Sequence, residues 1–251
     1  MNIRKISLAF ALSLMTTMVF SQIEISDDTQ STEPVKEVSL DISPLLSTTE
    51  FFVIANWSRN SRKLIENNNN NGIYADPLGA RADESFLNTW SFGIGIKQRV
   101  HQYVTWEGGI TYIQNGESYL FEDADTVHSY QTMYSYITMP VKVFFTYGNT
   151  VRFYAGGGLV PKMFLNYKQD RVFVDAVNNE TTEELKTQNG FNSFALSAVA
   201  NVGVQLNLGK KMSVLFMPEY RFQLTTSNED SDSYKHFNRA FGFNIGLTYG
   251  L

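Results

Sequence analysis

The sequence predicts an all-β protein, a single eight-stranded antiparallel up-and-down transmembrane β-barrel. Three observations predict it: apolar and polar residues alternate along eight segments, the gaps between segments are alternately long and short, and charges avoid the apolar face. The closing segment, residues 237–251, shows the alternation clearly. Its odd positions are apolar except for Arg239, and its even positions carry Asn, Ala, Gly and Thr. A period of two indicates a β-strand.

The residues before the barrel divide into two segments. Residues 1–21 place Arg4 and Lys5 before an apolar run from Ile6 to Phe20, which predicts a secretory signal peptide. Residues 22–46 carry six acidic residues and one lysine, which predicts an acidic, disordered periplasmic tail. The barrel is then expected over 47–251. The chain has no cysteine, so disulfide bonds cannot stabilise it.

Eight strands are expected in order, each justified by its alternation. They lie near 47–58, 87–100, 103–114, 131–146, 150–165, 191–208, 212–226 and 237–251. Long gaps fall at 59–86, 115–130, 166–190 and 227–236, and tight turns fall near 101, 148 and 210. Short periplasmic turns and long extracellular loops are typical of outer-membrane barrels.

Side-chain parity predicts which face of each strand points into the barrel. The face that carries charge is otherwise built from Gly, Ala, Ser, Thr and Asn, which suits a narrow lumen better than a water-exposed surface. We expect an ion-paired lumen plug of Lys97, Arg99, Glu107, Lys142, Arg152, Lys162, Glu219 and Arg221. The opposite face is expected to meet lipid through Trp90, Phe92, Ile94, Trp106, Phe216, Phe243, Ile245 and Leu247. A conduction path along the same charges is the alternative.

Two prolines and a glycine run interrupt the alternation. Pro140 and Pro218 fall inside expected strands, where a missing N–H predicts β-bulges. The run AGGG at 155–158 predicts a bend or a close approach of the backbone to a neighbouring strand. In the last strand, Asn244→Asp is expected to be mild, because the lumen holds more Lys and Arg than Glu.

Several segments together carry a resemblance to a known family. The signal peptide, YITMPVKVFF at 136–145, FYAGGGL at 153–159 and the closing FGFNIGLTYGL resemble the outer-membrane β-barrel family common in the Bacteroidota, which includes PorT-like proteins. The resemblance covers roughly 47–251 and implies location in the cell outer membrane, but it carries no catalytic or ligand-binding motif. It also implies an alternative role, an accessory subunit of protein secretion with the acidic tail as its docking element.

The sequence offers little chemistry beyond the barrel. His128 and Ser129 could supply the base and hydroxyl of a lipid-modifying enzyme, although adjacent strand residues point to opposite faces. Acidic clusters at 121–125 and 228–232 could hold a divalent cation but lack the spacing of a calcium loop. We therefore expect no catalytic residue, metal or cofactor. The expected partners are outer-membrane lipid, lipopolysaccharide and envelope or secretion proteins, and not nucleic acid. A soluble lipocalin-like carrier and a small channel are further alternatives.

Overall fold

The computed structural model describes residues 49–66, 82–123, 126–177, 179–228 and 234–251. The predicted signal peptide and acidic tail lie outside these residues. Ten strands form one sheet, and no helix among the described residues is long and apolar enough to cross a membrane. The strands are β1 (Thr49–Glu66), β2 (Ser85–His101), β3 (Val104–Asp123), β4 (Thr126–Thr138), β5 (Val141–Tyr147), β6 (Val151–Val174), β7 (Glu180–Thr187), β8 (Phe194–Asn207), β9 (Met212–Gln223) and β10 (Tyr234–Gly250).

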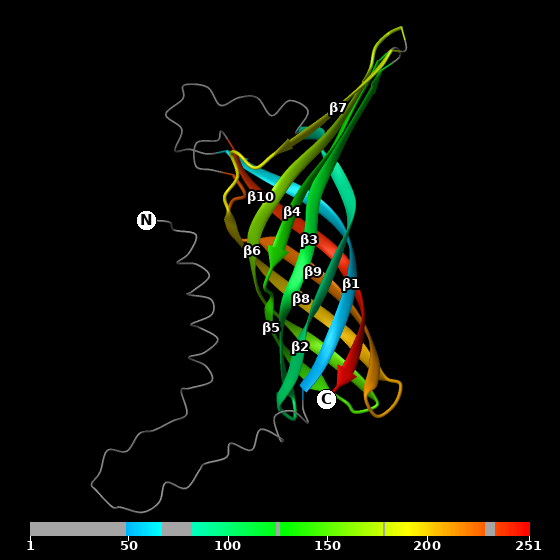
Figure 1. Cartoon of the computed structure of the whole chain (residues 1–251), viewed down its shortest axis with the longest axis vertical. Coiled ribbons are helices and arrows are strands. Elements are labelled where there is room, and N and C mark those ends of the chain that lie inside the picture. The colour runs from blue at the N-terminus through cyan, green and yellow to red at the C-terminus, as the bar shows by residue number, and fades with distance from the viewer. Residues whose placement is uncertain (1–48, 67–81, 124–125, 178, 229–233) are drawn as a thin grey trace, which may run out of the picture. The chain divides into compact units, whose positions relative to one another are not determined.

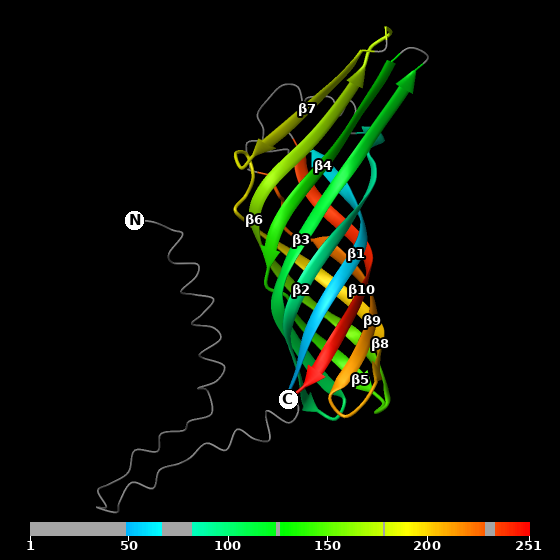
Figure 2. The same ribbon diagram turned by 45° about the vertical axis from the view of Figure 1, so that its right-hand side comes forward.

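The sheet closes on itself. The strand order runs β2-β1-β10-β9-β8-β6-β4-β3, and β3 pairs again with β2. Every pairing is antiparallel, and β4 and β5 share one position in the ring between β3 and β6 (Figures 1 and 2). The all-β, antiparallel, up-and-down prediction is confirmed. Apart from shifted strand ends, such as that of β1, which continues to Glu66, the strands differ from the expected eight in two places.

The first difference is at Pro140. The strand expected over 131–146 ends at Thr138 and resumes at Val141, so Pro140 interrupts the strand instead of forming a bulge within it. The backbone N–H of Met139 donates to the carbonyl oxygen of Pro161 at 3.0 Å, which ties the interruption to β6. Proline causes the break because it has no N–H to offer the ladder.

Pro218 behaves differently from Pro140, and the bulge expected there is absent. β9 stays in register with β10, where Pro218 faces Phe243. On the other side, the pairs Asn201↔Glu219 and Val204↔Phe216 keep one register, and only the pairs between them are missing. The missing N–H therefore interrupts the β8–β9 ladder locally without inserting a residue.

The second difference is at two expected loops. Most of 115–130 and 166–190 is strand, because β3 continues to Asp123, β4 begins at Thr126, β6 continues to Val174, and β7 pairs with β6 alone. A strand outside the barrel still pairs with its neighbours, but neither of its faces has to be apolar. Its sequence therefore need not alternate between apolar and polar residues, and the alternation pattern does not reveal it. We call residues 116–123, 126–133, 167–174 and 180–187 the projecting sheet. It extends past the other strands at the end opposite the tight turns (Figures 1 and 2).

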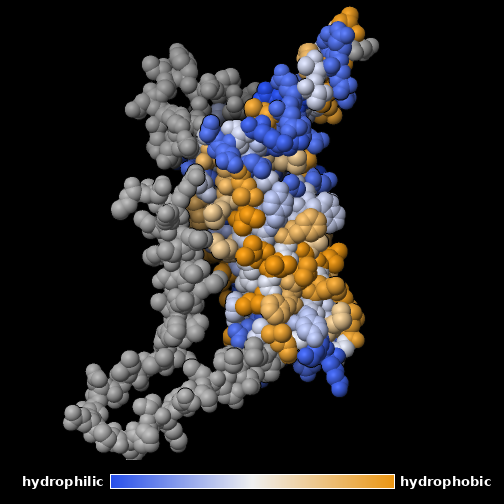
Figure 3. Space-filling view, in the orientation of Figure 1, coloured by the Kyte–Doolittle hydropathy of each residue, from blue (hydrophilic) through white to orange (hydrophobic). Residues whose placement is uncertain are grey.

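Large apolar side chains form a band on the outside of the barrel, which we call the apolar belt. On β10 it runs from Phe241 to Tyr249, and on β3 it ends at Tyr112, after which Gln114 takes the next outward position. On the visible face the belt lies between polar surfaces at both ends (Figure 3). This arrangement reverses that of a water-soluble protein, in which the largest apolar side chains are buried.

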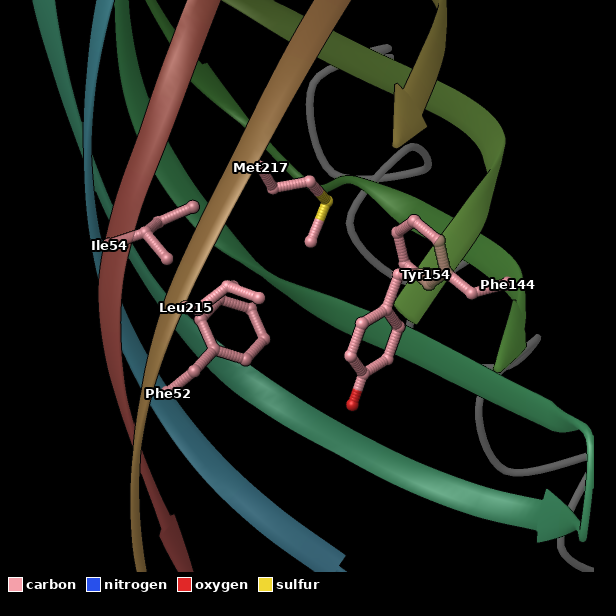
Figure 4. Close-up of a cluster of buried hydrophobic side chains, with 6 residues drawn as sticks. All are labelled: Phe52, Ile54, Phe144, Tyr154, Leu215 and Met217. Atoms are coloured by element: carbon pink, nitrogen blue, oxygen red, sulfur yellow. The ribbon is translucent and has the colours of Figure 1, made fainter. Parts of the chain in front are cut away.

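The inside of the barrel is mainly polar. Among the described residues, buried polar and charged side chains outnumber buried apolar ones. One apolar cluster of Phe52, Ile54, Phe144, Tyr154, Leu215 and Met217 lies inside near the tight turns, with the Tyr154 hydroxyl pointing away from it (Figure 4). The close approach expected at 155–158 is present. A Cβ added at Gly158 would collide with the carbonyl oxygen of Val141.

Candidate functional site

The first feature of the lumen is a chain of buried charges, which we call the central ion network. Lys97 faces Glu107 across the β2–β3 ladder, and Glu107 faces Lys142 across the β3–β5 ladder. The Lys97 Nζ lies 3.8 Å from Glu107 Oε2, and the Lys142 Nζ lies 3.2 Å from Glu107 Oε1. Antiparallel pairing brings opposite charges on one face together, so three strands position this half of the network.

The network continues across the lumen to the opposite wall. Lys142 Nζ lies 3.5 Å from Glu219 Oε2 on β9, and Arg221 Nε lies 3.9 Å from Glu219 Oε1. Asn201 and Asn244 each donate from Nδ2 to Glu219 Oε2 at 3.1 Å. Buried charges are costly unless paired and hydrogen-bonded, and each carboxylate here has cationic partners. The Lys142–Glu219 contact joins β5 to β9, which are not neighbours in the sheet.

A second group of charges lies nearer the tight turns. Arg152 pairs with Glu50, whose other oxygen accepts a hydrogen bond from Gln205 Nε2 at 2.8 Å. Gln205 Oε1 accepts from the Tyr154 hydroxyl at 2.8 Å and lies 3.5 Å from Lys97 Nζ. Gln205 therefore connects this group to the central ion network.

A third group, which we call the outer-mouth cluster, lies towards the projecting sheet. Arg62 pairs with Glu84, and its Nη1 lies 3.4 Å from Glu117 Oε1. The Tyr134 hydroxyl donates to the same Glu117 oxygen at 2.8 Å, and His236 Nδ1 lies 3.2 Å from Arg62 Nη1. Glu117 lies beyond the apolar belt. Burial raises its pKa to about 7, against the attraction of Arg62, and the charge of Glu84 adds to the rise.

Two of the predicted lumen charges have no ion pair among the described residues. Lys162 is buried, donates from Nζ to Gln223 Oε1 at 2.8 Å and lies over the Tyr136 ring at 4.9 Å. Arg99 points inward near the tight turns. Six of the eight predicted lumen charges therefore take part in ion pairs: Lys97, Glu107, Lys142, Arg152, Glu219 and Arg221.

The eight side chains predicted to meet lipid all lie on the outer face. Trp90, Phe92, Ile94, Phe216, Ile245 and Leu247 are exposed, and the exposed fraction is 59% for Ile245. Phe243 is half-buried because it stacks between Trp57 and Phe216, at centroid distances of 6.2 and 5.8 Å. Trp106 is also half-buried, and its Nε1 donates to Gln98 Oε1 at 2.9 Å.

The carboxylates that pair with Arg152 and with Arg62 were not identified from the sequence. Glu50 lies at the start of β1, where parity could have identified it as inward-facing. Glu84 and Glu117 lie in segments taken as loops, so their orientation was not considered. Arg62 was missed for the same reason, because β1 extends eight residues past its predicted end at 58.

The candidate catalytic and metal residues do not form a site. In β4, His128 packs against Tyr119 and Phe173, whereas Ser129 is the next residue and points to the opposite face. No group of three or more His, Cys, Asp or Glu residues suited to a metal ion occurs in the described part of the chain. Parts of both acidic clusters, at 124–125 and 229–232, lie outside it.

Comparisons with known proteins give weak likenesses only. No family model and no curated protein matches the chain. Among solved structures, Neisserial surface protein A matches with a TM-score of 0.42 at 11% identity, covering 80% of this chain and 97% of that protein. Ail, the attachment invasion locus protein of Yersinia pestis, matches at 0.34 and 12%, covering 80% and 98%. The N-terminal β-barrel domain of Pseudomonas aeruginosa OprF matches at 0.30 and 10%, covering 79% and 96%. Scores and identities this low support no statement about activity or partners.

Asn244→Asp should destabilise the barrel, contrary to the mild effect that the excess of lumen cations suggests. Asn244 donates to Glu219, so aspartate would replace a donor with a second carboxylate. We expect a loss of about 1–3 kcal/mol in the free energy of unfolding. The control is Asn238→Asp, because Asn238 donates instead to Gln223 Oε1, which also accepts from Lys162. Denaturant titration showing a larger loss for Asn238→Asp would contradict this geometry.

The raised pKa of Glu117 predicts a pH-dependent stability. The folded protein holds the Glu117 proton more tightly than the unfolded chain does, so this contribution is complete below about pH 4.5 and is lost as the pH rises towards about 7. Between pH 4.5 and 8, the wild type should lose up to about 3 kcal/mol more stability than Glu117→Gln.

Urea titration followed by tryptophan fluorescence measures this difference. Glu122→Gln is the matched control, because Glu122 lies exposed on the same strand. Its pH profile should follow that of the wild type. Parallel profiles for the wild type and Glu117→Gln would show that the Glu117 proton does not stabilise the fold.

Proposed function

We propose that this protein is a non-enzymatic integral barrel of the bacterial outer membrane that presents the projecting sheet to the outside of the cell. Counting β4 and β5 as one interrupted strand, and β7 as part of the projecting sheet, the barrel has eight strands. The observation that carries the proposal is the reversal of polarity, with large apolar side chains outside and polar or charged ones inside. Transmembrane barrels show this arrangement because lipid surrounds them.

A water-soluble barrel is the direct alternative, and it is expected to have a polar outer surface and an apolar interior. Soluble monomers rarely expose continuous apolar patches beyond a few hundred Å². Here the apolar belt includes Val53, Ile94, Val143, Leu247 and Ile245, each exposed by more than half. A lipocalin-like carrier would instead hold its apolar residues inside, around a ligand cavity.

Cationic side chains near both limits of the belt support the membrane placement. At the end near the projecting sheet, Arg59 lies over the Phe86 ring at 4.1 Å, and Arg239 is exposed on β10. At the tight-turn end, Lys211 lies over the Tyr249 ring at 5.5 Å. Long basic side chains and aromatic rings are typical of the interface between lipid and water. We place the tight turns in the periplasm, since short turns occupy that side in outer-membrane barrels.

The projecting sheet is the part suited to an interaction role. The side chains on both faces of β7 are exposed. On one face of the projecting sheet, ion pairs form among Lys168, Asp170, Glu184 and Lys186. The other face carries Phe121 and Phe173, which are 48% and 47% exposed. Lipopolysaccharide and envelope proteins are the expected contacts. No observation on the described residues favours the PorT-like secretion role, which depends on the tail at 22–46, or a lipid-modifying activity.

Replacing Ile245 with Arg tests the proposal. If Ile245 faces lipid near the bilayer midplane, Ile245→Arg should lower the stability of protein folded in lipid vesicles by about 2–4 kcal/mol. The control is Phe237→Arg, an outward position on the same strand that lies past Arg239 and outside the belt. Denaturant titration of both variants measures the effect. A neutral Ile245→Arg, together with recovery of the wild type as a soluble periplasmic monomer, would overturn the membrane placement.

The central ion network predicts that the lumen does not conduct. Lys142 contacts carboxylates on both walls, and an eight-stranded interior has little space beyond its own side chains. Planar-bilayer recordings should therefore show no stable channel of porin size. Large, uniform and persistent conductance steps would identify the protein as a pore and exclude the plug.

A further inference from the structure

An open depression lies at the tight-turn end of the barrel, and we call it the turn-end vestibule. Its volume is about 440 Å³. Arg99 lines it from β2, and Arg152, Asn149, Thr150 and Asn207 line it from β6, β8 and the turn before β6. A Cβ added at Gly209, also in its lining, would meet nothing within 4 Å, so that side is open. The vestibule is neither part of the central ion network nor filled by it.

The guanidinium groups of the vestibule have spare hydrogen-bond donors. No hydrogen bond or ion pair involves the Arg99 side chain among the described residues. Arg152 uses Nη1 for Glu50, but its Nε is buried without a hydrogen-bond partner. An arginine presents five N–H donors and cannot lose its charge, so these groups need acceptors.

The charges around the vestibule do not balance. Glu50 is the carboxylate that contacts Arg152, and it also accepts from Gln205. Lys97 lies just beyond Gln205 and shares Glu107 with Lys142. Among the described residues, Arg99 therefore adds a positive charge with no matching carboxylate. Several cations around a concave surface with few anions raise the local concentration of an anionic ligand.

The uncharged wall of the vestibule is fixed in place. Asn207 Nδ2 donates to the Asn149 carbonyl oxygen at 2.7 Å, and the Ser213 hydroxyl donates to Asn207 Oδ1 at 2.8 Å. The Asn207 backbone N–H donates to the Thr150 carbonyl oxygen at 3.0 Å. These bonds join the β5–β6 and β8–β9 turns. This uncharged wall is therefore organised before any ligand arrives, which lowers the entropic cost of binding.

We propose that the turn-end vestibule binds a phosphate group, with the guanidinium groups of Arg99 and Arg152 as its ligands. Arginine suits this chemistry because its planar fork matches two phosphate oxygens at once. With the tight turns in the periplasm, the phosphate can come from a lipid head group at the adjacent membrane surface or from a soluble phosphate compound. The two sources share one binding chemistry and differ in the need for acyl chains.

The experiment is isothermal titration of the purified full-length protein in an uncharged detergent, with two probes. Inorganic phosphate represents the soluble source, and dihexanoyl phosphatidic acid represents the lipid source. The wild type should bind at least one probe saturably, and added salt should weaken binding. Arg99→Gln should weaken it about tenfold or more, the effect of losing one charge-assisted contact. Arg99→Lys should retain part of the affinity, since it keeps the charge but not the fork.

The control variant is Arg59→Gln, which removes an exposed arginine at the opposite end of the barrel and should leave binding unchanged. We expect Arg99→Gln to fold normally, because the Arg99 side chain makes no hydrogen bond or ion pair within the described part of the chain. Tighter binding of dihexanoyl phosphatidic acid than of inorganic phosphate would identify the ligand as a lipid head group. Equal affinity for the two probes would show that the site recognises the phosphate group alone. The proposal is wrong if neither probe binds saturably to the wild type, or if Arg99→Gln binds as tightly as the wild type.

Discussion

The pairing of the first strand with the last is the constraint on which the rest of this structure depends. β1 and β10 form an uninterrupted antiparallel ladder from Glu50↔Gly250 to Glu66↔Tyr234. This ladder closes the sheet, so among the described residues the ring of barrel strands has no free edge strand. In lipid, such open groups would have no partners, and closure is the only way for a sheet to cross a membrane. Closure also turns one face of every strand into a confined lumen.

Confinement explains the contents of the lumen. The polar face cannot reach bulk water along most of its length, so its charges have to satisfy one another. Most of them do so in connected groups: the central ion network, the Glu50–Arg152 pair joined to it by Gln205, and the outer-mouth cluster of Arg62, Glu84 and Glu117. Lys162 donates to the uncharged Gln223 instead. Beyond the barrel rim this constraint ends, and the projecting sheet carries exposed ion pairs and aromatic rings.

Alternation in the sequence predicted the fold because period two directly records which face a residue occupies. On β2 and β10 it placed Trp90 and Ile245 outside, and Lys97 and Asn244 inside, as they lie in the structure. Alternation does not record inter-strand register, so it could not show that Asn244 donates to Glu219. It also failed past the rim, where β7 and the ends of β3 and β6 need no apolar face. Pro140 and Pro218 look equivalent in sequence, and only the neighbouring ladders distinguish them.

The central claim is that the odd positions of β10 face lipid and the even positions face the lumen. The chain has no cysteine, so each single cysteine substitution from Phe241 to Tyr249 can carry one nitroxide label. In vesicles, collision rates with oxygen, which concentrates in lipid, should be high at odd positions and low at even ones. Collision with a polar nickel reagent should stay low at the odd positions inside the belt. High nickel accessibility at Ile245 and Leu247, with no two-residue period for oxygen, would contradict a lipid-facing belt.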